Sequence, residues 1–220
     1  MAMESLTALR QPFELGDAPT PEEDADARHK VGAGEAPRAA EPTGFARRLE
    51  SIELPLVRAA TRSAHPLALR ALAILLSKLG NGWIYLILGA LILANWGVAG
   101  VRIIVPAGVN AMVLHSVYPV MKRAFGRRRP FQADPRLPSL LKTLDAHSFP
   151  SGHTMTLAGV LTPIVMLWPG STLPATVVGL GVAWSRIATA HHYPTDVIAG
   201  AVLGFGVGYP MTTLMVSVWG

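Results

Sequence analysis

Residues 82–96 read GWIYLILGALILANW, a segment that contains no charged residue. Four further apolar segments follow at residues 98–121, 154–168, 172–190 and 197–219, and the charged residues within them are Arg102 and Arg186. A membrane-spanning helix needs about 20 mostly apolar residues, and the shorter segments approach this length if their flanking turn residues are helical. The pattern predicts an all-α fold, a polytopic transmembrane helical bundle of about five spans.

The overall composition supports this interpretation. Half of the 220 residues are hydrophobic and 15% are charged, whereas soluble domains carry about 25% charged residues. This excludes an ordinary soluble globule and disorder of the whole chain. The chain has no cysteine, which excludes disulfides, zinc–thiolate sites, iron–sulfur centres and cysteine nucleophiles.

Charge divides the chain into two parts. Residues 1–45 hold nine acidic and four basic residues, and residues 46–220 hold five acidic and fifteen basic ones. We predict a disordered acidic tail over 1–45 and a membrane domain over 46–220, with its transmembrane bundle at 80–220. Residues 46–79 alternate apolar and basic side chains, which favours interfacial amphipathic helices divided at Pro66. The alternative is that 52–79 forms a sixth span.

Three polar clusters lie at the ends of the apolar segments. The first, residues 122–130 (KRAFGRRRP), is either a cytoplasmic basic flank or a cradle for an anion, since lysine and arginine both bind phosphate oxygens. The second, residues 149–154 (FPSGHT), precedes the third segment. Its Ser151 is either a helix cap or part of an anion site at a helix start, while His153 can transfer a proton near neutral pH.

The third cluster, residues 185–196 (SRIATAHHYPTD), ends the fourth segment and begins the fifth. Asp196 is either a first-turn acid favoured by the helix dipole or the carboxylate that orients a histidine four residues earlier. With alternating spans, all three clusters fall on one membrane face. Independent flanking charges would not bring histidines, a Ser-Gly turn and a carboxylate with them, so we predict one composite site.

Together the clusters resemble the three signature motifs of the type 2 phosphatidic acid phosphatase superfamily. The matching patterns are Lys122-x6-Arg129-Pro130, Pro150-Ser151-Gly152-His153 and Ser185-Arg186-x5-His192-x3-Asp196. The resemblance covers about residues 70–215, and no motif position is missing.

The resemblance implies a metal-independent phosphatase that hydrolyses the phosphomonoester or diphosphate headgroup of a membrane lipid. His192 would attack phosphorus to form a phosphohistidine, Asp196 would hold His192, and His153 would protonate the leaving oxygen and later activate water. The phosphoryl oxygens would be bound by Lys122, Arg129, Ser151, Gly152 and Arg186. Arg127 and Arg128 adjoin Arg129 and share its role in one interpretation, and spacing alone assigns the nucleophile to His192 rather than His191.

Two other functions fit these residues less well. A vanadate-dependent haloperoxidase uses the same cradle, but that branch of the family is soluble. A non-enzymatic carrier that holds acidic lipids on a basic face would not need the complete motifs. No cofactor or metal is predicted, because two-metal phosphatases need several clustered carboxylates and the body holds five acidic residues in all. The expected partners are a lipid phosphate and the bilayer, with no nucleic acid.

The expected location is a bacterial inner membrane. Membrane members of the family commonly have six spans, and five are predicted here. With five spans, the basic residues of 46–79 lie on the active-site side, and the positive-inside tendency then favours a cytoplasmic site. The alternative, a periplasmic site, follows from the family resemblance and from a sixth span.

Overall fold

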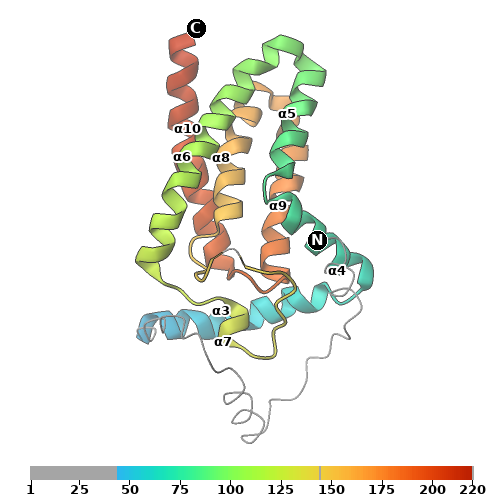
Figure 1. The fold of residues 1–220 in the computed structure, drawn as a ribbon, viewed down its shortest axis with the longest axis vertical. Coiled ribbons are helices and arrows are strands. Elements are labelled where there is room, and N and C mark those ends of the chain that lie inside the picture. Colours follow the sequence, from blue (N-terminus) through green and yellow to red (C-terminus); the bar gives the residue numbers. More distant parts are fainter. Residues whose placement is uncertain (1–43, 144, 220) are drawn as a thin grey trace, which may run out of the picture.

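The protein is a bundle of long helices whose lower end rests on a transverse helix. The computed structural model describes residues 44–143 and 145–219, and every regular element in these residues is helical (Figure 1). The bundle helices are α5 (Trp83–Trp96), α6 (Val101–Phe125), α8 (Gly152–Leu167), α9 (Thr172–Ala188) and α10 (Pro194–Trp219). The short 3-10 turns η1 (Gly97–Gly100) and η2 (Pro169–Ser171) join α5 to α6 and α8 to α9. The all-α prediction is confirmed, and each predicted apolar segment lies on one of these helices.

Much of the outer surface of the bundle is apolar. Large hydrophobic side chains are exposed on four of its helices, among them Leu86, Val120, Leu180, Val202 and Leu214. By length and hydropathy, two stretches are long and apolar enough to cross a membrane, Trp83–Ala133 and Pro194–Val218, and Gly152–Leu167 is a shorter apolar helix. The first stretch contains both α5 and α6, which run in opposite directions (Figure 1).

The basic segment before the bundle forms two helices that do not run parallel to it. α3 (Gly44–Ser63) lies across the lower end of the bundle, and α4 (Leu67–Leu79) rises obliquely from it towards α5 (Figure 1). α3 packs through Val57 against Ala190 and Tyr193, which lie between α9 and α10. Because α3 begins at Gly44, the last two residues of the predicted tail are helical, a boundary shift of the usual size. Residues 1–43 of that tail lie outside the described part of the chain.

Close packing at the centre of the bundle holds the helix ends in place. α8 packs against α6, α9 and α10. Gly204 of α10 lies so close to α8 that a Cβ atom there would stand 2.1 Å from the carbonyl oxygen of Met155, so any side chain would separate the two helices. The buried amide nitrogen of Asn110 lies 3.0 Å from the carbonyl oxygen of Gly159 and 3.2 Å from Oγ1 of Thr212, which ties α6 to both partners.

A left-handed turn at the end of α6 directs the first polar cluster beneath the bundle. Gly126 has φ of +60°, a conformation that glycine adopts at little cost, and its N–H bonds to the carbonyl oxygen of Lys122. The chain then runs under the bundle to the one-turn helix α7 (Pro130–Ala133), which lies beside α3 (Figure 1). This turn carries Arg127 and Arg129 to the ends of the other helices.

Candidate active site

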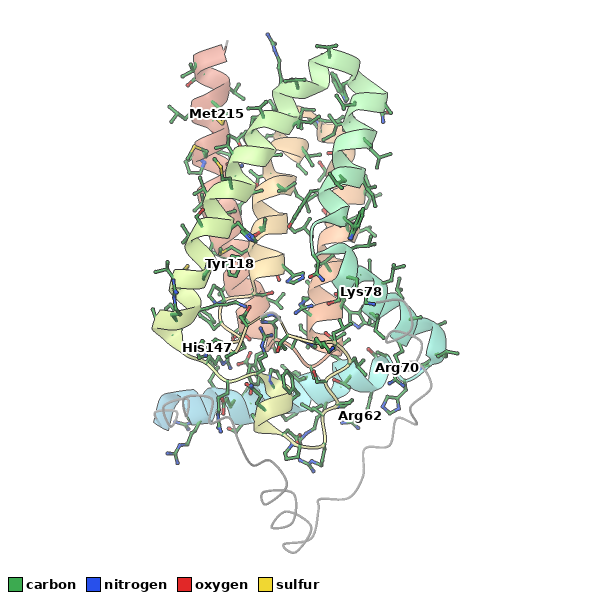
Figure 2. All side chains as sticks on the ribbon, viewed as in Figure 1. Arg62, Arg70, Lys78, Tyr118, His147 and Met215 are labelled. Carbon is green, nitrogen blue, oxygen red and sulfur yellow. The ribbon has the colours of Figure 1, made fainter. Side chains whose placement is uncertain are left out.

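The chain segments that carry the predicted site residues meet at the end of the bundle nearest α3. There α6 and α9 end while α8 and α10 begin (Figure 1). A cavity of about 1390 Å³ opens at this end, and Figure 2 shows Tyr118 of α6 and Lys78 of α4, which both line it, on opposite sides of the region. Six of the eight predicted site residues line the cavity: Lys122, Arg129, Gly152, His153, Arg186 and His192.

Three buried cations stand together at the cavity wall. Lys122, Arg129 and Arg186 come from α6, the loop after it and α9, and each is at most 6% exposed. Arg129 donates from Nη1 to the carbonyl oxygen of His191 at 2.9 Å, and Arg186 donates to the hydroxyl of Ser77 on α4. Burying three positive charges is costly unless an anion balances them. The three cations therefore need negative charge beside them.

In this structure a carboxylate of the chain supplies part of that balance. Asp145, in the loop between α7 and α8, lies 2.7 Å from Nζ of Lys122 and 2.7 Å from Nη2 of Arg129. Burial on its own raises the pKa of Asp145, but the hydrogen bond and charge of Lys122, together with the charge of Arg129, lower it below its usual range. Asp145 is thus ionised at neutral pH, and its carboxylate occupies both cations.

His192 stands next to the cations with its Nδ1 side towards Asp196. The distance from Nδ1 to Oδ2 of Asp196 is 3.6 Å, longer than a hydrogen bond, and Nδ1 has no hydrogen-bond partner among the described residues. Burial, followed by the charge of Arg186, lowers the pKa of His192 well below its usual value. The imidazole is therefore neutral at pH 7, and with Nδ1 facing Asp196, Nε2 is the nitrogen available to the cavity.

Asp196 is fully buried at the start of α10 and is held at both oxygens. Oδ2 accepts the backbone N–H of Tyr193 at 2.9 Å, and Oδ1 accepts a hydrogen bond from Nη1 of Arg127 at 2.6 Å. The carboxylate faces His192 from behind and does not line the cavity. Its position suits an orienting group and not one that touches a ligand.

His153 begins α8 on the opposite side of the cluster. Its Nε2 lies 2.6 Å from Oδ1 of Asn81 in the turn between α4 and α5. Since an amide oxygen only accepts, this contact places a proton on Nε2. The neighbouring Gly152 lines the cavity, and a Cβ there would stand 3.2 Å from the ring of Tyr118.

Ser151 stands at the N-cap position of α8, one of the two places that the sequence allowed, and not on the cavity wall. It is completely buried and is absent from the residues that line the cavity. Its hydroxyl accepts a hydrogen bond from Thr154 at 2.7 Å, and its N–H bonds to the carbonyl oxygen of Asp196. In this structure Ser151 joins the starts of α8 and α10.

The structure also distinguishes the two adjacent histidines. Nδ1 of His191 lies 2.7 Å from the carbonyl oxygen of Thr189, and its Nε2 lies 3.1 Å from that of Leu141. Burial and the charge of Arg186 lower the pKa of His191 to about 3, so the ring is neutral and donates from one nitrogen. Its ring faces backbone carbonyls, whereas His192 lines the cavity.

Comparison with known proteins assigns the family. The model of the PAP2 superfamily matches residues 100–219, more than half of the chain and all eight predicted site positions. The chain belongs to the PAP2 superfamily. The resemblance read from the three motifs is therefore confirmed.

Two relatives of the chain are named as lipid phosphatases. The chain is 27% identical over 174 residues to the lipid A 1-phosphatase of Rhizobium etli, a match that covers 70% of this chain and 74% of that one. It is 36% identical over 134 residues to the decaprenylphosphoryl-5-phosphoribose phosphatase of Mycobacterium tuberculosis, covering 58% and 68%. The chain is thus a hydrolase of a lipid phosphatase family.

Two solved PAP2-type structures share the fold. The crystal structure of LpxE from Aquifex aeolicus aligns with a TM-score of 0.61 and 23% identity, covering 74% of this chain and 95% of that one. A transmembrane PAP2-type phosphatidylglycerolphosphate phosphatase from Bacillus subtilis aligns with a TM-score of 0.58 and 21% identity, covering 78% and 88%. This likeness shows a shared fold, and the apolar outer surface with two stretches long enough to cross a membrane indicates a membrane protein.

Several residues at this PAP2 site were not found from sequence. Asn81 and Asp145 lie outside the motifs and contact His153 and Lys122 respectively. Arg127 and Arg128 do not share the place of Arg129 at the cavity wall: Arg127 pairs with Asp196 and Glu53, and Arg128 lies 3.8 Å from Glu50. One sequence signal could have indicated Asp145 and Glu53. Acidic residues are few in the basic, apolar part of the chain, so each of them is expected to pair with a basic residue.

Proposed function

We propose that the protein is a metal-independent phosphatase that removes a phosphate from the headgroup of a membrane lipid through a phosphohistidine intermediate. The observation that carries this proposal is the single cavity wall that holds three buried cations beside a neutral histidine backed by a carboxylate. Phosphoryl transfer needs chiefly positioning and charge neutralisation. These groups supply both.

In the first step His192 is the nucleophile. The phosphoryl oxygens bind Lys122, Arg129 and Arg186, displacing the carboxylate of Asp145 from the first two. Nε2 of His192 attacks phosphorus, and a P–N bond forms while the bond between phosphorus and the lipid oxygen breaks. His153 acts in its imidazolium form, with a proton on each ring nitrogen, and donates the proton on Nε2 to that oxygen, becoming neutral. The lipid then leaves as an alcohol, or as a monophosphate when the substrate is a diphosphate.

In the second step water completes the hydrolysis. His153, now lacking that proton, accepts one from a water molecule whose oxygen attacks phosphorus. The P–N bond breaks, inorganic phosphate leaves, and His192 returns to its neutral form. Asp196 holds the Nδ1 side of His192 throughout, as orienting carboxylates do in related nucleophile–histidine arrangements.

The size and lining of the cavity favour a lipid over a small soluble phosphate. Its volume of about 1390 Å³ exceeds the roughly 300–1,000 Å³ of a typical small-molecule site. Away from the cations the wall includes Tyr85 of α5 and Ala111 and Met112 of α6, whose outer faces are apolar. A headgroup at the cations therefore leaves room for the first part of its hydrocarbon chain.

Phosphate release from a panel of lipids tests this function. The purified protein in detergent with a metal chelator is expected to release phosphate from at least one phosphorylated lipid, and glycerol 3-phosphate serves as the soluble control. The panel consists of phosphatidic acid, phosphatidylglycerol phosphate, lipid A, decaprenylphosphoryl-5-phosphoribose, and polyprenyl mono- and diphosphates. Release from none of them, or release that requires a divalent metal, would contradict the proposal.

The proposed topology has five spans, with α3 and α4 at the interface and the site on the α3 side. It is supported by α3 lying across the bundle end and by the C-terminal end of α10 pointing to the opposite end (Figure 1). Basic residues gather on the α3 side, at Arg47, Arg48, Arg58, Arg62, Arg70 and Lys78. By the positive-inside tendency this side faces the cytoplasm of a bacterial inner membrane.

A reporter fused after residue 220 checks that orientation. An alkaline phosphatase fusion, active in the periplasm, is expected to be active there, and a fluorescent protein that folds only in the cytoplasm is expected to stay dark. The same reporters placed in the loop after α7 provide the control and are expected to give the opposite pattern. A cytoplasmic C-terminus would place the site in the periplasm and overturn the assignment.

A further inference from the structure

We infer that Arg127, clamped by Glu53 of α3, is a positioning residue for Asp196, so that the N-terminal transverse helix forms part of the catalytic apparatus. This inference rests on the proposed function. Arg127 occupies one of the unspecified positions of the first motif, and Glu53 precedes residues 100–219 that the family model covers.

The guanidinium of Arg127 joins two acidic side chains that come from opposite parts of the chain. Its Nη1 donates to Oδ1 of Asp196 at 2.6 Å, and its Nη2 donates to Oε2 of Glu53 at 2.5 Å. The side chains are 13%, 0% and 4% exposed for Arg127, Asp196 and Glu53. These are buried charge-assisted hydrogen bonds, which are stronger than exposed ion pairs.

Two further contacts fix the plane of the guanidinium. It stacks over the ring of Tyr193, 4.0 Å from Cζ to the ring centre, and Nη1 also donates to Oγ1 of Thr195 at 2.8 Å. Tyr193 and Thr195 lie directly between His192 and Asp196. Arg127 therefore holds the whole short segment that joins the proposed nucleophile to its carboxylate.

Glu53 contacts the same segment without help from Arg127. Its Oε1 accepts the backbone N–H of Thr195 at 2.8 Å, and its Oε2 accepts the hydroxyl of Thr195 at 3.0 Å. That N–H belongs to the first turn of α10, where backbone donors lack partners within the helix. α3 thereby supplies a cap for the helix that carries Asp196.

The orientation of the Asp196 carboxylate depends on Arg127 and, through Arg127, on Glu53. With Oδ1 held by Arg127 and Oδ2 by the N–H of Tyr193, the carboxylate has one orientation, and Oδ2 faces Nδ1 of His192 at 3.6 Å. Without Arg127 the carboxylate keeps the backbone N–H of Tyr193 at Oδ2 but loses its charged partner at Oδ1. A planar arginine fork reaches two acids at once, which a lysine does not.

Arg127 and Glu53 also affect the electrostatic potential at His192. Groups that face or surround His192 are Asp196 from α10, Arg186 from α9, Lys122 from α6, and Arg129 and His191 from the adjoining loops. Arg127 offsets the charge of Asp196, so its loss stabilises protonated His192 and raises the pKa of that histidine. Loss of the Glu53 charge leaves more of the positive charge of Arg127 uncompensated, and this lowers the pKa of His192.

The test measures kcat, KM and the acidic limb of kcat against pH for Arg127→Gln and Glu53→Gln. We expect kcat to fall roughly 10- to 100-fold for Arg127→Gln, as for other residues that orient a reacting group, with KM little changed. Because protonated His192 cannot attack, the acidic limb should move to higher pH in Arg127→Gln and to lower pH in Glu53→Gln. Arg127→Lys should keep the limb near that of the wild type while still lowering kcat.

The neighbouring pair provides matched controls. Arg128→Gln and Glu50→Gln remove a looser pair at 3.8 Å on the same helix and loop, and both are expected to retain wild-type kcat and pH profile. If Arg127→Gln fails to fold, the shift of the acidic limb to lower pH in Glu53→Gln still tests the inference. The inference would be overturned if the acidic limb of the kcat–pH profile did not shift in either variant, or shifted in the same direction in both.

The two proposals fail in distinguishable ways. If the wild-type protein releases phosphate from a lipid but Arg127→Gln behaves like Arg128→Gln, the clamp is refuted and the phosphatase stands. If the wild-type protein releases none from any lipid, the proposed function fails and this inference fails with it.

Discussion

Replacing His192 with alanine is expected to reduce phosphate release from the preferred lipid to background. The proposal assigns this ring the bond to phosphorus, and the loss of a nucleophile typically costs at least about 10³-fold in rate. The three cations remain in place, so inorganic phosphate, which binds through its oxygens without a bond to His192, should still bind with affinity within a few-fold of the wild type. A large loss in kcat with a retained anion site identifies a residue that reacts.

Single-turnover assays make this prediction specific. Wild-type protein mixed with a lipid labelled in its phosphate and quenched in alkali is expected to carry label on a histidine, and His192→Ala should carry none. His147→Ala serves as the control, because His147 lies in the loop before α8 and is absent from the cavity lining. Activity of His192→Ala close to that of the wild type would exclude His192 as the nucleophile.

Replacing His153 with alanine is expected to lower kcat for a lipid substrate by about 10² to 10⁴, the usual range for a general acid. The reason is the poor leaving group: a lipid alkoxide needs a proton as the P–O bond breaks. An aryl phosphate with an acidic phenol leaves without that help. The loss of kcat/KM in His153→Ala, which reports the first step, should therefore be much smaller for p-nitrophenyl phosphate than for the lipid.

The ratio of the activity lost on the lipid to the activity lost on the aryl phosphate distinguishes the role of His192 from that of His153. His192→Ala should lose activity on both substrates alike, because both need the nucleophile, whereas His153→Ala should lose it selectively on the lipid. The values of kcat/KM for each variant on each substrate measure this, because kcat/KM reports the first step and the later attack of water needs His153 with both substrates. Equal losses in His153→Ala on the lipid and on the aryl phosphate would contradict the general-acid role.

The helices of the bundle could be predicted from sequence because a bilayer restricts the backbone conformations that can cross it. A backbone that crosses hydrocarbon must satisfy its own hydrogen bonds, so it forms long apolar helices interrupted by turns. The predicted segments at 82–96 and 172–190 correspond to α5 (Trp83–Trp96) and α9 (Thr172–Ala188) within two residues at either end. The placement of α3 across the bundle end was less accessible, since an amphipathic pattern does not say which surface the helix packs on.

The motifs identified the candidate site because its charged residues are too costly in an apolar body to occur by chance. Their spacing along the chain, with alternating helix directions, was sufficient to bring Lys122, His153 and His192 to one end of the bundle. It did not separate residues that line the cavity from those behind it. Ser151 and Asp196 matched the motifs equally well, and the structure buries both behind the wall.

Sequence alone therefore determined the class of fold, the family and the set of residues from which the site is built, because apolar length and motif spacing are local properties of the chain. Tertiary structure decided which of those residues face the cavity and which partners hold them. Asp145 on Lys122, Asn81 on His153 and Glu53 on Arg127 join residues between 23 and 74 positions apart. Such pairs leave no periodic signal, since they arise only when helix packing brings distant charges into a low-dielectric space where each requires a partner.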